Sequence, residues 1–218
     1  MGNLLLIFVK WPEPGTVKTR LAQSVGNQEA AEIYRILVRR VLKLLTPLMA
    51  NRADCSDYEA VTTWLLFAPP SREQEATEWL QGEAFSAGWH SGRITVKPQA
   101  CGDLGNRLRV AFGQGFAAGF ERVAAIGTDC VELDAGLLRE SWRQLSGNCD
   151  LVFGPATDGG YYLVAMNCPE ARVVFDDIPW SSGLTLTRSL EVAGRSGFNA
   201  TLLEQLGDVD TIDDWQRV

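Results

Sequence analysis

Hydrophobic and polar positions along the chain form blocks, and one kind of block is short and uniformly apolar. Residues 4–9 are all apolar, and this run stops at Lys10 and Pro12. A run without polar alternation is typical of a strand buried on both faces of a sheet. We predict further strands at residues 61–67, 93–97, 123–126, 150–154, 161–166 and 198–203.

The other kind of block has apolar residues at helical spacing. A helix is predicted to begin at Asn27, which can cap it, and to end at Pro47. Its apolar residues fall on one face: Ile33, Leu37, Val41, Leu44 and Leu48. The opposite face carries Arg35, Arg39 and Lys43. We interpret this basic face as a solvated helix surface rather than a binding patch.

Helical segments alternate with strands along the rest of the chain. They are expected at residues 72–80, after the cap Asp103, at 135–145, from 184 after Ser181 or Ser182, and near Asp210. The polar residues 51–59 indicate a loop. This alternation predicts a three-layer α/β fold with a mainly parallel sheet between helices, and the turn at residues 158–160 adds an antiparallel step. We expect a single domain over residues 1–218.

The net charge of the chain limits the classes of partner that it can bind. Its formal net charge is −7 and its pI is about 4.8, so no general basic surface is available for nucleic acid or an anionic membrane. An anionic ligand must therefore be held by a local basic site. The apolar run at 4–9 is too short for a signal sequence or a membrane span. We expect a soluble cytoplasmic protein with small-molecule partners.

Cysteine and histidine usage excludes several kinds of site. The chain has an odd number of cysteines without Cys-x-x-Cys spacing: Cys55, Cys101, Cys130, Cys149 and Cys168. This pattern favours reduced thiols over a disulfide framework. The single histidine, His90, lies in a polar stretch that predicts an exposed loop, and one histidine excludes a His-rich zinc site.

The segment after the first strand carries candidate chemistry. Pro14 and Gly15 shape a loop, and three cations converge on it: Lys10, Lys18 and Arg20. Ligands of open α/β sheets bind at the carboxyl ends of strands, so this loop is a candidate phosphate clamp. The alternative is an ordinary turn with surface cations. The loop lacks Gly-Lys-Ser/Thr and is not a Walker A motif.

Carboxylates follow two other predicted strands. Asp129 follows residues 123–126 after Gly127 and Thr128, and Asp208 and Asp210 precede the last helix. Aspartate oxygens at a strand end suit Mg²⁺, which also takes phosphate oxygens as ligands. A turn or helix-capping role is the alternative for each.

The turn Asp158-Gly159-Gly160 has two interpretations. Its glycines allow close approach of an acceptor substrate, and they equally suit a plain hairpin turn. These residues do not distinguish contact with an acceptor from a plain hairpin turn.

Together these segments resemble the nucleotide-diphospho-sugar transferase superfamily with the glycosyltransferase A fold. The resemblance extends to an uncharacterised bacterial glycosyltransferase-like group, sometimes labelled a radical-SAM/selenodomain-associated transferase, and to phospholactate guanylyltransferases. It rests on four motifs in order: Lys10-x-Pro12-x-Pro14-Gly15-x-Val17-Lys18-Thr19-Arg20-Leu21, Gly127-Thr128-Asp129-Cys130, Gly154-Pro155-Ala156-x-Asp158-Gly159-Gly160-Tyr161-Tyr162-Leu163 and Asp208-Val209-Asp210-Thr211-x-x-Asp214. One departure is Val131, where the group usually has proline, which leaves this strand end less rigid.

The resemblance implies a set of site residues. The metal ligands for Mg²⁺ (or Mn²⁺) would be Asp129 and Asp210, with Asp208 as the alternative. The residues binding nucleotide and phosphate would be Pro14, Gly15, Lys18, Arg20, Asp103 and Arg107. The acceptor would contact Asp158, Gly159 and Gly160, and the catalytic residues would be Lys18, Arg20 and Asp129.

The implied activity is metal-dependent transfer from an activated nucleotide to a small-molecule acceptor. Glycosyl transfer from a nucleotide-diphospho-sugar is favoured by the resemblance. Nucleotidyl transfer with release of pyrophosphate, as in guanylyl- and cytidylyltransferases, is the first alternative. A nucleotide-binding module without catalysis is the second. The sequence does not name the base, the sugar or the acceptor.

Overall fold

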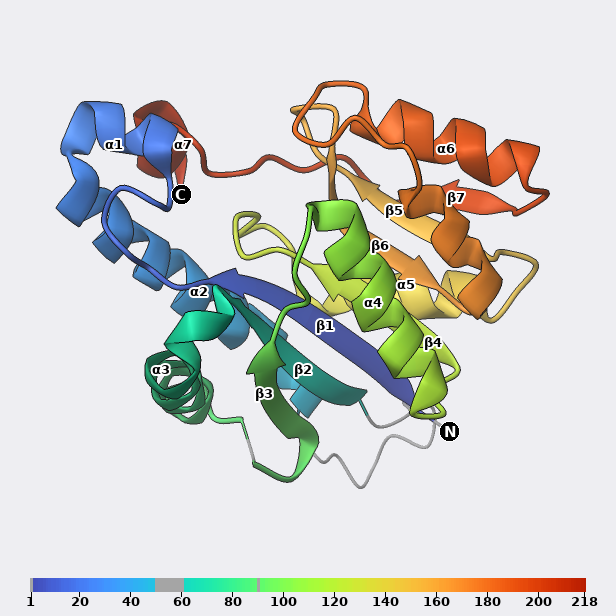
Figure 1. Ribbon diagram of the computed structural model, residues 1–218, viewed down its shortest axis with the longest axis horizontal. Coiled ribbons are helices and arrows are strands. Elements are labelled where there is room, and N and C mark those ends of the chain that lie inside the picture. Colours follow the sequence, from blue (N-terminus) through green and yellow to red (C-terminus); the bar gives the residue numbers. More distant parts are fainter. Residues whose placement is uncertain (1, 50–60, 90) are drawn as a thin grey trace.

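A seven-stranded sheet with the order β3-β2-β1-β4-β6-β5-β7 forms the centre of the protein (Figure 1). This computed structural model describes residues 2–49, 61–89 and 91–218. The strands are β1 (Asn3–Lys10), β2 (Val61–Ala68), β3 (Ile94–Pro98), β4 (Arg122–Ile126), β5 (Leu151–Pro155), β6 (Tyr161–Met166) and β7 (Ala200–Leu202). Neighbouring strands are parallel except β6, which is antiparallel to both β4 and β5.

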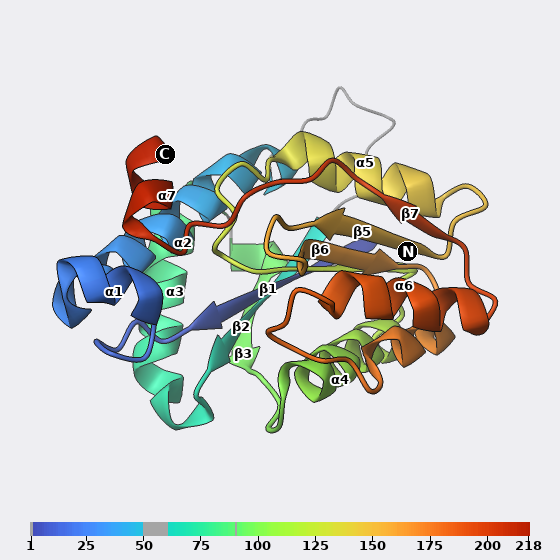
Figure 2. The same ribbon diagram turned by 90° about the horizontal axis from the view of Figure 1, so that it is seen from above.

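Helices cover both faces of the sheet. They are α1 (Thr19–Val25), α2 (Asn27–Met49), α3 (Glu73–Ser86), α4 (Leu104–Ala117), α5 (Ala135–Leu145), α6 (Thr185–Arg195) and α7 (Ile212–Arg217), with 3₁₀ turns η1 (Pro70–Arg72), η2 (Ser91–Arg93) and η3 (Pro169–Phe175). In Figure 2, α2 and α5 lie on one side of the sheet and α4 and α6 on the other. The predicted three-layer α/β fold with a mixed sheet is therefore confirmed.

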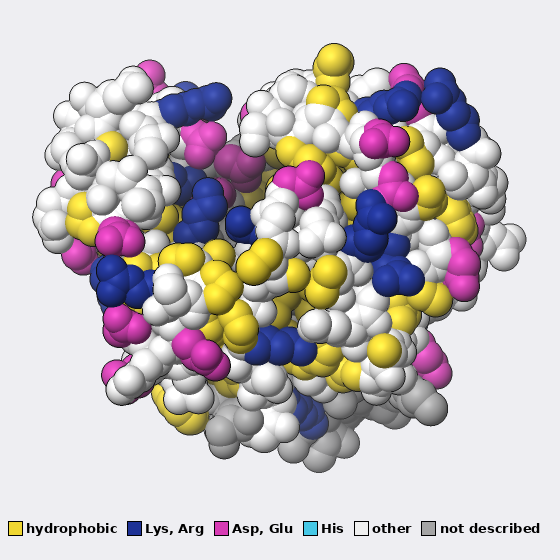
Figure 3. Space-filling view, in the orientation of Figure 1, with side chains coloured by type: hydrophobic (Ala, Val, Ile, Leu, Met, Phe, Trp, Pro, Cys, Tyr) yellow, Lys and Arg dark blue, Asp and Glu magenta, His cyan; other side chains and the backbone are white. Residues whose placement is uncertain are grey.

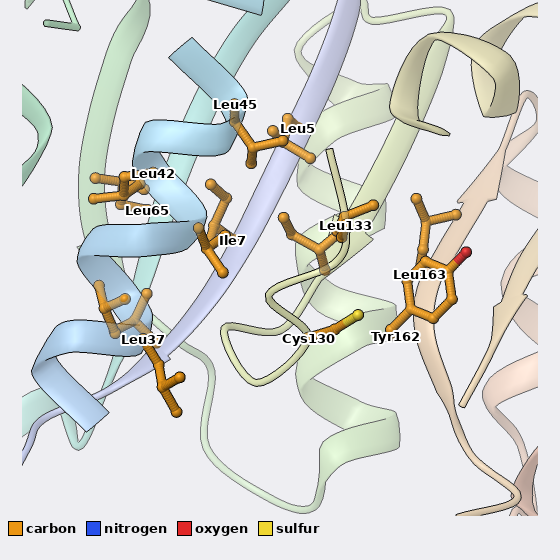
Figure 4. Packing of buried hydrophobic residues seen from close by; sticks show 14 of the residues in the cluster. Leu5, Ile7, Leu37, Leu42, Leu45, Leu65, Cys130, Leu133, Tyr162 and Leu163 are labelled. Carbon is orange, nitrogen blue, oxygen red and sulfur yellow. The ribbon is translucent and has the colours of Figure 1, made fainter. Parts of the chain in front are cut away.

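The side chains of β1 explain why its sequence does not alternate. Leu5 and Ile7 pack into the core on the α2 side, whereas Leu4 and Leu6 belong to the core on the α4 side. Figure 4 shows Leu5 and Ile7 beneath the α2 leucines. Each face of the strand meets a helical layer, so every position favours an apolar residue.

The helix predicted from Asn27 to Pro47 corresponds to α2, and both its predicted beginning and its predicted end are wrong. Asn27 is its first helical residue rather than its cap, because a separate helix, α1, ends at Val25 and only its C-cap, Gly26, comes between them. Pro47 lies inside α2, which continues to Met49. Extending the helix past Pro47 buries Leu48 and Met49 in the core, and this burial offsets the missing backbone hydrogen bond of proline.

Other predicted segments differ at their ends. The helix predicted at 72–80 runs from Glu73 to Ser86. Leu184, rather than Ser181 or Ser182, is the N-cap residue of α6, although Ser182 Oγ accepts a hydrogen bond from the Leu184 N–H at 3.3 Å. The interpretations of residues 51–59 and of His90 lie outside the described residues. No helix within the described ranges is long and apolar enough to cross a membrane.

The basic face of α2 is not simply solvated. Arg39 forms two hydrogen bonds with the Glu83 carboxylate of α3, at 2.7 and 2.8 Å. These bonds lower the pKa of Glu83, opposed in part by burial. Arg35 lies over the rings of Trp11 and Trp79. Arg39 and Lys43 are exposed, as predicted for a solvated helix surface, whereas Arg35 is partly buried, and tertiary neighbours engage both arginines.

Candidate functional site

The strand order changes direction between β1 and β4. The chain passes from β1 outward to β2 and β3, and then returns to place β4 on the other side of β1. Such a reversal opens a crevice at the carboxyl ends of the two strands, where ligands of open α/β sheets bind. The space-filling view shows a hollow there, between the lobe of α1 and α7 and the lobe of α6, in which side chains of both charges meet (Figure 3).

A tight turn directs the loop after β1 toward this crevice. The Thr16 N–H donates to the Glu13 carbonyl at 3.0 Å, with Pro14 and Gly15 between them. Gly15 has a φ of 84°. Proline followed by a residue with positive φ is the arrangement of a type II turn, which glycine adopts without strain. Pro14 and Gly15 therefore shape the loop through the backbone.

Lys18 comes out of this loop with its side chain buried. Its backbone is left-handed, with a φ of 48°, at the N-cap of α1, and only 4% of its side chain is exposed. Its ammonium Nζ lies 2.7 Å from Asp129 Oδ1 and 3.2 Å from Asp210 Oδ1. Two carboxylates far apart in the sequence thus meet one buried cation.

Arg20 approaches the same carboxylate from outside. Its Nη1 is 3.6 Å from Asp210 Oδ2, and its side chain is 72% exposed. The guanidinium is therefore close to the cluster but open to solvent. A cation in this position can turn toward an anionic ligand at small cost in stability.

Backbone contacts bring Asp210 beside Asp129. The Val209 N–H donates to the Asp129 carbonyl at 3.0 Å, and the Val209 side chain is buried in the core. Just beyond, Thr211 and Asp214 form a capping box at the start of α7, and Asp214 also accepts a hydrogen bond from the Asp210 N–H. The segment is fixed on both sides of Asp210.

Tyr34 of α2 joins the ends of the two strands, and the sequence analysis missed it. Its hydroxyl accepts a hydrogen bond from the Lys10 N–H at 2.9 Å and lies 3.0 Å from Thr128 Oγ1. Burial, together with the negative charge of Asp129, raises the pKa of Tyr34. Its one signal in the sequence is its place beside Ile33 on an apolar helix face, which does not distinguish it from an ordinary core residue.

Two further carboxylates, those of Asp158 and Asp208, add to the negative charge near Asp129 and Asp210. Burial, followed by the negative charges of Asp129, Asp158 and Asp210, raises the pKa of Asp208 to about 7, while the charge of Lys18 opposes this rise. The carboxylates are thus close enough to repel one another. A site with this excess of negative charge favours a cation.

The carboxylates fit a hard divalent cation in part. Asp129 Oδ1 is buried and accepts no well-aligned hydrogen bond from the described residues, although the Lys18 ammonium pairs with it at 2.7 Å. Over the described ranges, no group of three or more His, Cys, Asp or Glu side chains could hold a metal by itself. Mg²⁺ usually takes one or two carboxylates and completes its shell with water and phosphate oxygens, so two aspartates suffice.

A pocket lies next to this cluster, over the ends of β1, β2 and β3. Its volume is about 360 Å³, and its walls include Trp11, Pro69, Cys101 and Arg107. Thr16, from the turn before Lys18, also lines it. The pocket and the charged cluster are therefore connected by one loop.

Asp103 and Arg107, both predicted to contact the nucleotide, occupy different positions in the structure. Arg107 lines the pocket. The Asp103 carboxylate accepts a hydrogen bond from the Asn106 N–H at 2.8 Å and caps α4, as its place in the sequence predicts. Asp103 thus fixes the helix start from which Arg107 extends. Its role as a direct nucleotide ligand stays a prediction.

The turn at residues 158–160 packs against the protein itself. Asp158 Oδ1 accepts a hydrogen bond from the Gly160 N–H at 2.8 Å, which closes the turn. A Cβ on Gly159 would lie 2.3 Å from the Gly183 carbonyl oxygen. The structure thus accounts for Gly159 by hairpin packing, while contact with an acceptor stays a prediction for all three residues.

The residues that follow Asp129 point inward. Cys130 and Val131 are both buried in the core, and Figure 4 shows Cys130 directed toward Tyr162. Burial raises the pKa of the Cys130 thiol to about 12. This cysteine is therefore a packing residue and not a thiolate nucleophile.

Solved structures of similar fold include one related in sequence. A protein from Desulfovibrio desulfuricans G20, described provisionally as a nucleotide-diphospho-sugar transferase, is 30% identical, with 99% of this chain and 85% of that chain covered and a TM-score of 0.81. A cytidylyltransferase from Leptospira borgpetersenii is 13% identical, with 99% and 84% covered and a TM-score of 0.55. Glucosyl-3-phosphoglycerate synthase from Mycobacterium tuberculosis is 11% identical, with 99% and 75% covered and a TM-score of 0.52.

The last two similarities show the fold alone, and the first confirms the expected superfamily. No curated protein matches the chain. A family model described as an uncharacterized protein conserved in bacteria (DUF2064) matches residues 53–182. The matched segment contains Asp129 and Arg107 but not Lys18 or Asp210. The chain belongs to the DUF2064 family.

Proposed function

We propose that this protein is a transferase that uses an activated nucleotide with a divalent metal ion, and that its donor is a nucleotide-diphospho-sugar. One observation carries the proposal: the buried Lys18 ammonium lies between Asp129 and Asp210 at the strand-order reversal, beside a pocket. Residues 1–218 would act as one nucleotide-binding domain, with a small-molecule acceptor and a cytoplasmic location.

The arrangement supports recognition of a diphosphate. Lys18 supplies a point charge held within reach of any group that the two carboxylates bind, because its side chain cannot move far from them. Arg20 supplies an exposed guanidinium that can grip phosphate oxygens with two hydrogen bonds. Cationic groups fixed in place stabilise the charge that develops on a departing diphosphate.

Asp129 and Asp210 would hold the metal, with Asp208 as the alternative ligand. When bound, Mg²⁺ or Mn²⁺ would supply charge neutralisation to the phosphates of the donor. The synthase of similar fold from Mycobacterium tuberculosis is complexed with Mn²⁺ and UDP, which supports this combination for the fold. In this chain, the excess of carboxylates around Lys18 is the feature that favours a divalent ion.

Nucleotidyl transfer is the alternative for the same residues. In that reaction the acceptor attacks the α-phosphorus of a nucleoside triphosphate and pyrophosphate leaves. In glycosyl transfer the acceptor attacks the sugar carbon and a nucleoside diphosphate leaves. The cytidylyltransferase of similar fold supports the first, and the Desulfovibrio relative, by its description, supports the second.

The test is a thermal-shift panel followed by product analysis. Nucleoside diphosphates, nucleotide sugars and nucleoside triphosphates are compared with and without Mg²⁺. A ligand present at one hundred times its Kd should add about 2.7 kcal/mol of apparent stability. The best donors are then incubated with Mg²⁺, and slow transfer to water is followed as release of nucleoside diphosphate.

Each outcome of the panel has a distinct meaning. Release of nucleoside diphosphate from a nucleotide sugar, lost in Asp210→Asn, supports glycosyl transfer. Release of pyrophosphate from a triphosphate supports nucleotidyl transfer instead. Stabilisation without turnover of any donor would favour a non-catalytic binding module, and absence of any metal-dependent stabilisation would contradict the proposal.

A further inference from the structure

We infer that the pocket beside Trp11 binds the nucleotide base, and that Trp11 and Arg107 select bases with a carbonyl at the distal ring position. These bases are guanine, uracil and thymine, as opposed to adenine and cytosine. The inference rests on the proposed use of a nucleotide and specifies which class of nucleotide fits.

The order of the strands fixes the direction of the nucleotide. The charged cluster of Lys18, Asp129 and Asp210 lies over the ends of β1 and β4, whereas the pocket lies over β1, β2 and β3. Phosphates held by the cluster therefore place the rest of the nucleotide over β2 and toward β3. A volume of about 360 Å³ is at the small end of ligand pockets, which suits a base and not a whole nucleotide sugar.

Trp11 is a fixed aromatic wall of this pocket. Its backbone N–H donates to the Ala68 carbonyl at 2.7 Å, which joins the ends of β1 and β2. The Arg35 guanidinium carbon lies over its ring at 5.6 Å and over the Trp79 ring at 5.3 Å, and the two indoles meet edge to face at 5.8 Å. The indole is held by cation–π and aromatic contacts. Because Trp11 lines the pocket, we expect the part of its indole that faces the pocket to stack against a base.

Arg107 lines the same pocket and is held by residues of the segment that follows β3. Its Nε donates to the Gly102 carbonyl at 2.9 Å, and its Nη1 donates to Gln99 Oε1 at 3.4 Å. Gln99 is buried, and its amide nitrogen donates to the carbonyls of Val9 and Leu66. These two bonds orient the Gln99 side chain with its oxygen toward Arg107, so the guanidinium has a set position.

The free hydrogen-bonding capacity of Arg107 consists of donors. A guanidinium has five N–H groups and no acceptor, and no described residue accepts a hydrogen bond from Nη2. The distal carbonyl of uracil or guanine can accept from such a group. Adenine and cytosine carry an amino group at that position, so donor would face donor, and an unpaired polar group in a pocket is strongly disfavoured.

The test is calorimetric titration with GDP, UDP, ADP and CDP in the presence of Mg²⁺, with pyrophosphate as a probe that has no base. In the wild type we expect GDP and UDP to bind at least ~10-fold more tightly than ADP and CDP. Arg107→Ala should reduce this preference to within ~3-fold and leave the pyrophosphate Kd unchanged. Arg107→Lys serves as a second variant if the alanine variant does not fold.

Trp11 and a control site complete the experiment. Trp11→Ala should weaken the binding of all four nucleoside diphosphates by ~10-fold or more, without changing the order of their affinities, because stacking does not distinguish bases. Trp11→Phe should retain most of the affinity. Arg143→Ala, an exposed arginine on α5, should leave every Kd unchanged.

Four results overturn the inference. Equal affinity of the wild type for the four diphosphates would remove the preference, and loss of pyrophosphate binding in folded Arg107→Ala would make Arg107 a phosphate ligand. If pyrophosphate binds but no diphosphate binds more tightly, the pocket is not a base site while the proposed function stands. If neither pyrophosphate nor any nucleotide binds, the proposed function fails and this inference fails with it.

Discussion

Two glycine turns at the carboxyl edge of the sheet look alike in the sequence and act differently in the structure. Gly15 and Gly159 have nearly the same φ, 84° and 86°. A Cβ on Gly15 would meet the Asn27 side chain at 3.5 Å, which is an ordinary contact, whereas one on Gly159 would overlap the Gly183 backbone at 2.3 Å. The first glycine shapes a loop that delivers Lys18 to the site, and the second packs a hairpin against the approach to α6.

The comparison shows that a glycine turn at a strand end does not by itself indicate ligand contact. What separates the two turns is the chain segment packed against each of them, which local sequence does not encode. The following variants test this separation in order of decreasing effect.

Gly159→Ala should have the largest effect, on stability. The new Cβ would overlap the Gly183 carbonyl and would force a side chain into a left-handed backbone conformation. We expect the free energy of unfolding to fall by about 3 kcal/mol or more. Urea denaturation measures it, and Gly194→Ala, a helical glycine with open space around it, is the control. A loss of unfolding free energy below about 1 kcal/mol would show that the hairpin can move away easily from the segment at Gly183 that precedes α6.

Lys18→Met should have the next largest effect, on ligand binding. Removal of the ammonium leaves Asp129 and Asp210 to repel a phosphate ligand and removes its positive partner. We expect binding of pyrophosphate with Mg²⁺ to weaken by about 2–3 kcal/mol. Calorimetry measures this loss, and Lys43→Met, an exposed lysine on α2, should bind as the wild type does. Unchanged binding would place the phosphates away from Lys18.

Arg20→Ala should weaken binding less and leave the fold unaffected. Its side chain is 72% exposed, so the free energy of unfolding should change by less than about 0.5 kcal/mol. Loss of a charge-assisted contact to phosphate should cost about 1.5 kcal/mol of binding, and Arg20→Lys should restore only part of it. Titrations of both variants, with their melting temperatures, test this. A large drop in melting temperature would identify Arg20 as a structural residue.

Gly15→Ala should have the smallest effect. No backbone atom approaches the added Cβ, so the expected loss is the strain of a left-handed alanine, about 1 kcal/mol of unfolding free energy. Pyrophosphate binding should weaken slightly, because the turn leads to Lys18. A loss as large as that of Gly159→Ala would remove the difference between the two turns.

Much of the fold follows from local patterns in the chain. The uniformly apolar residues at 4–9 and 123–126 and the largely apolar residues at 61–67 lie in β1, β4 and β2, because a strand covered on both faces has no polar side. The helix predicted at 135–145 and the strand predicted at 161–166 match α5 and β6 in their bounds. Local periodicity is strong in these segments, and tertiary contacts do not override it.

The sequence by itself also determined where chemistry could lie, since charged residues follow buried strands at Lys18 and Asp129. Only the tertiary structure decided that the Lys18 side chain is buried between Asp129 and Asp210, that Tyr34 joins the ends of β1 and β4, and that Arg35 supports Trp11. These contacts join residues distant in sequence. Their formation depends on strand order and on the packing of whole helices, which no local window of the sequence contains.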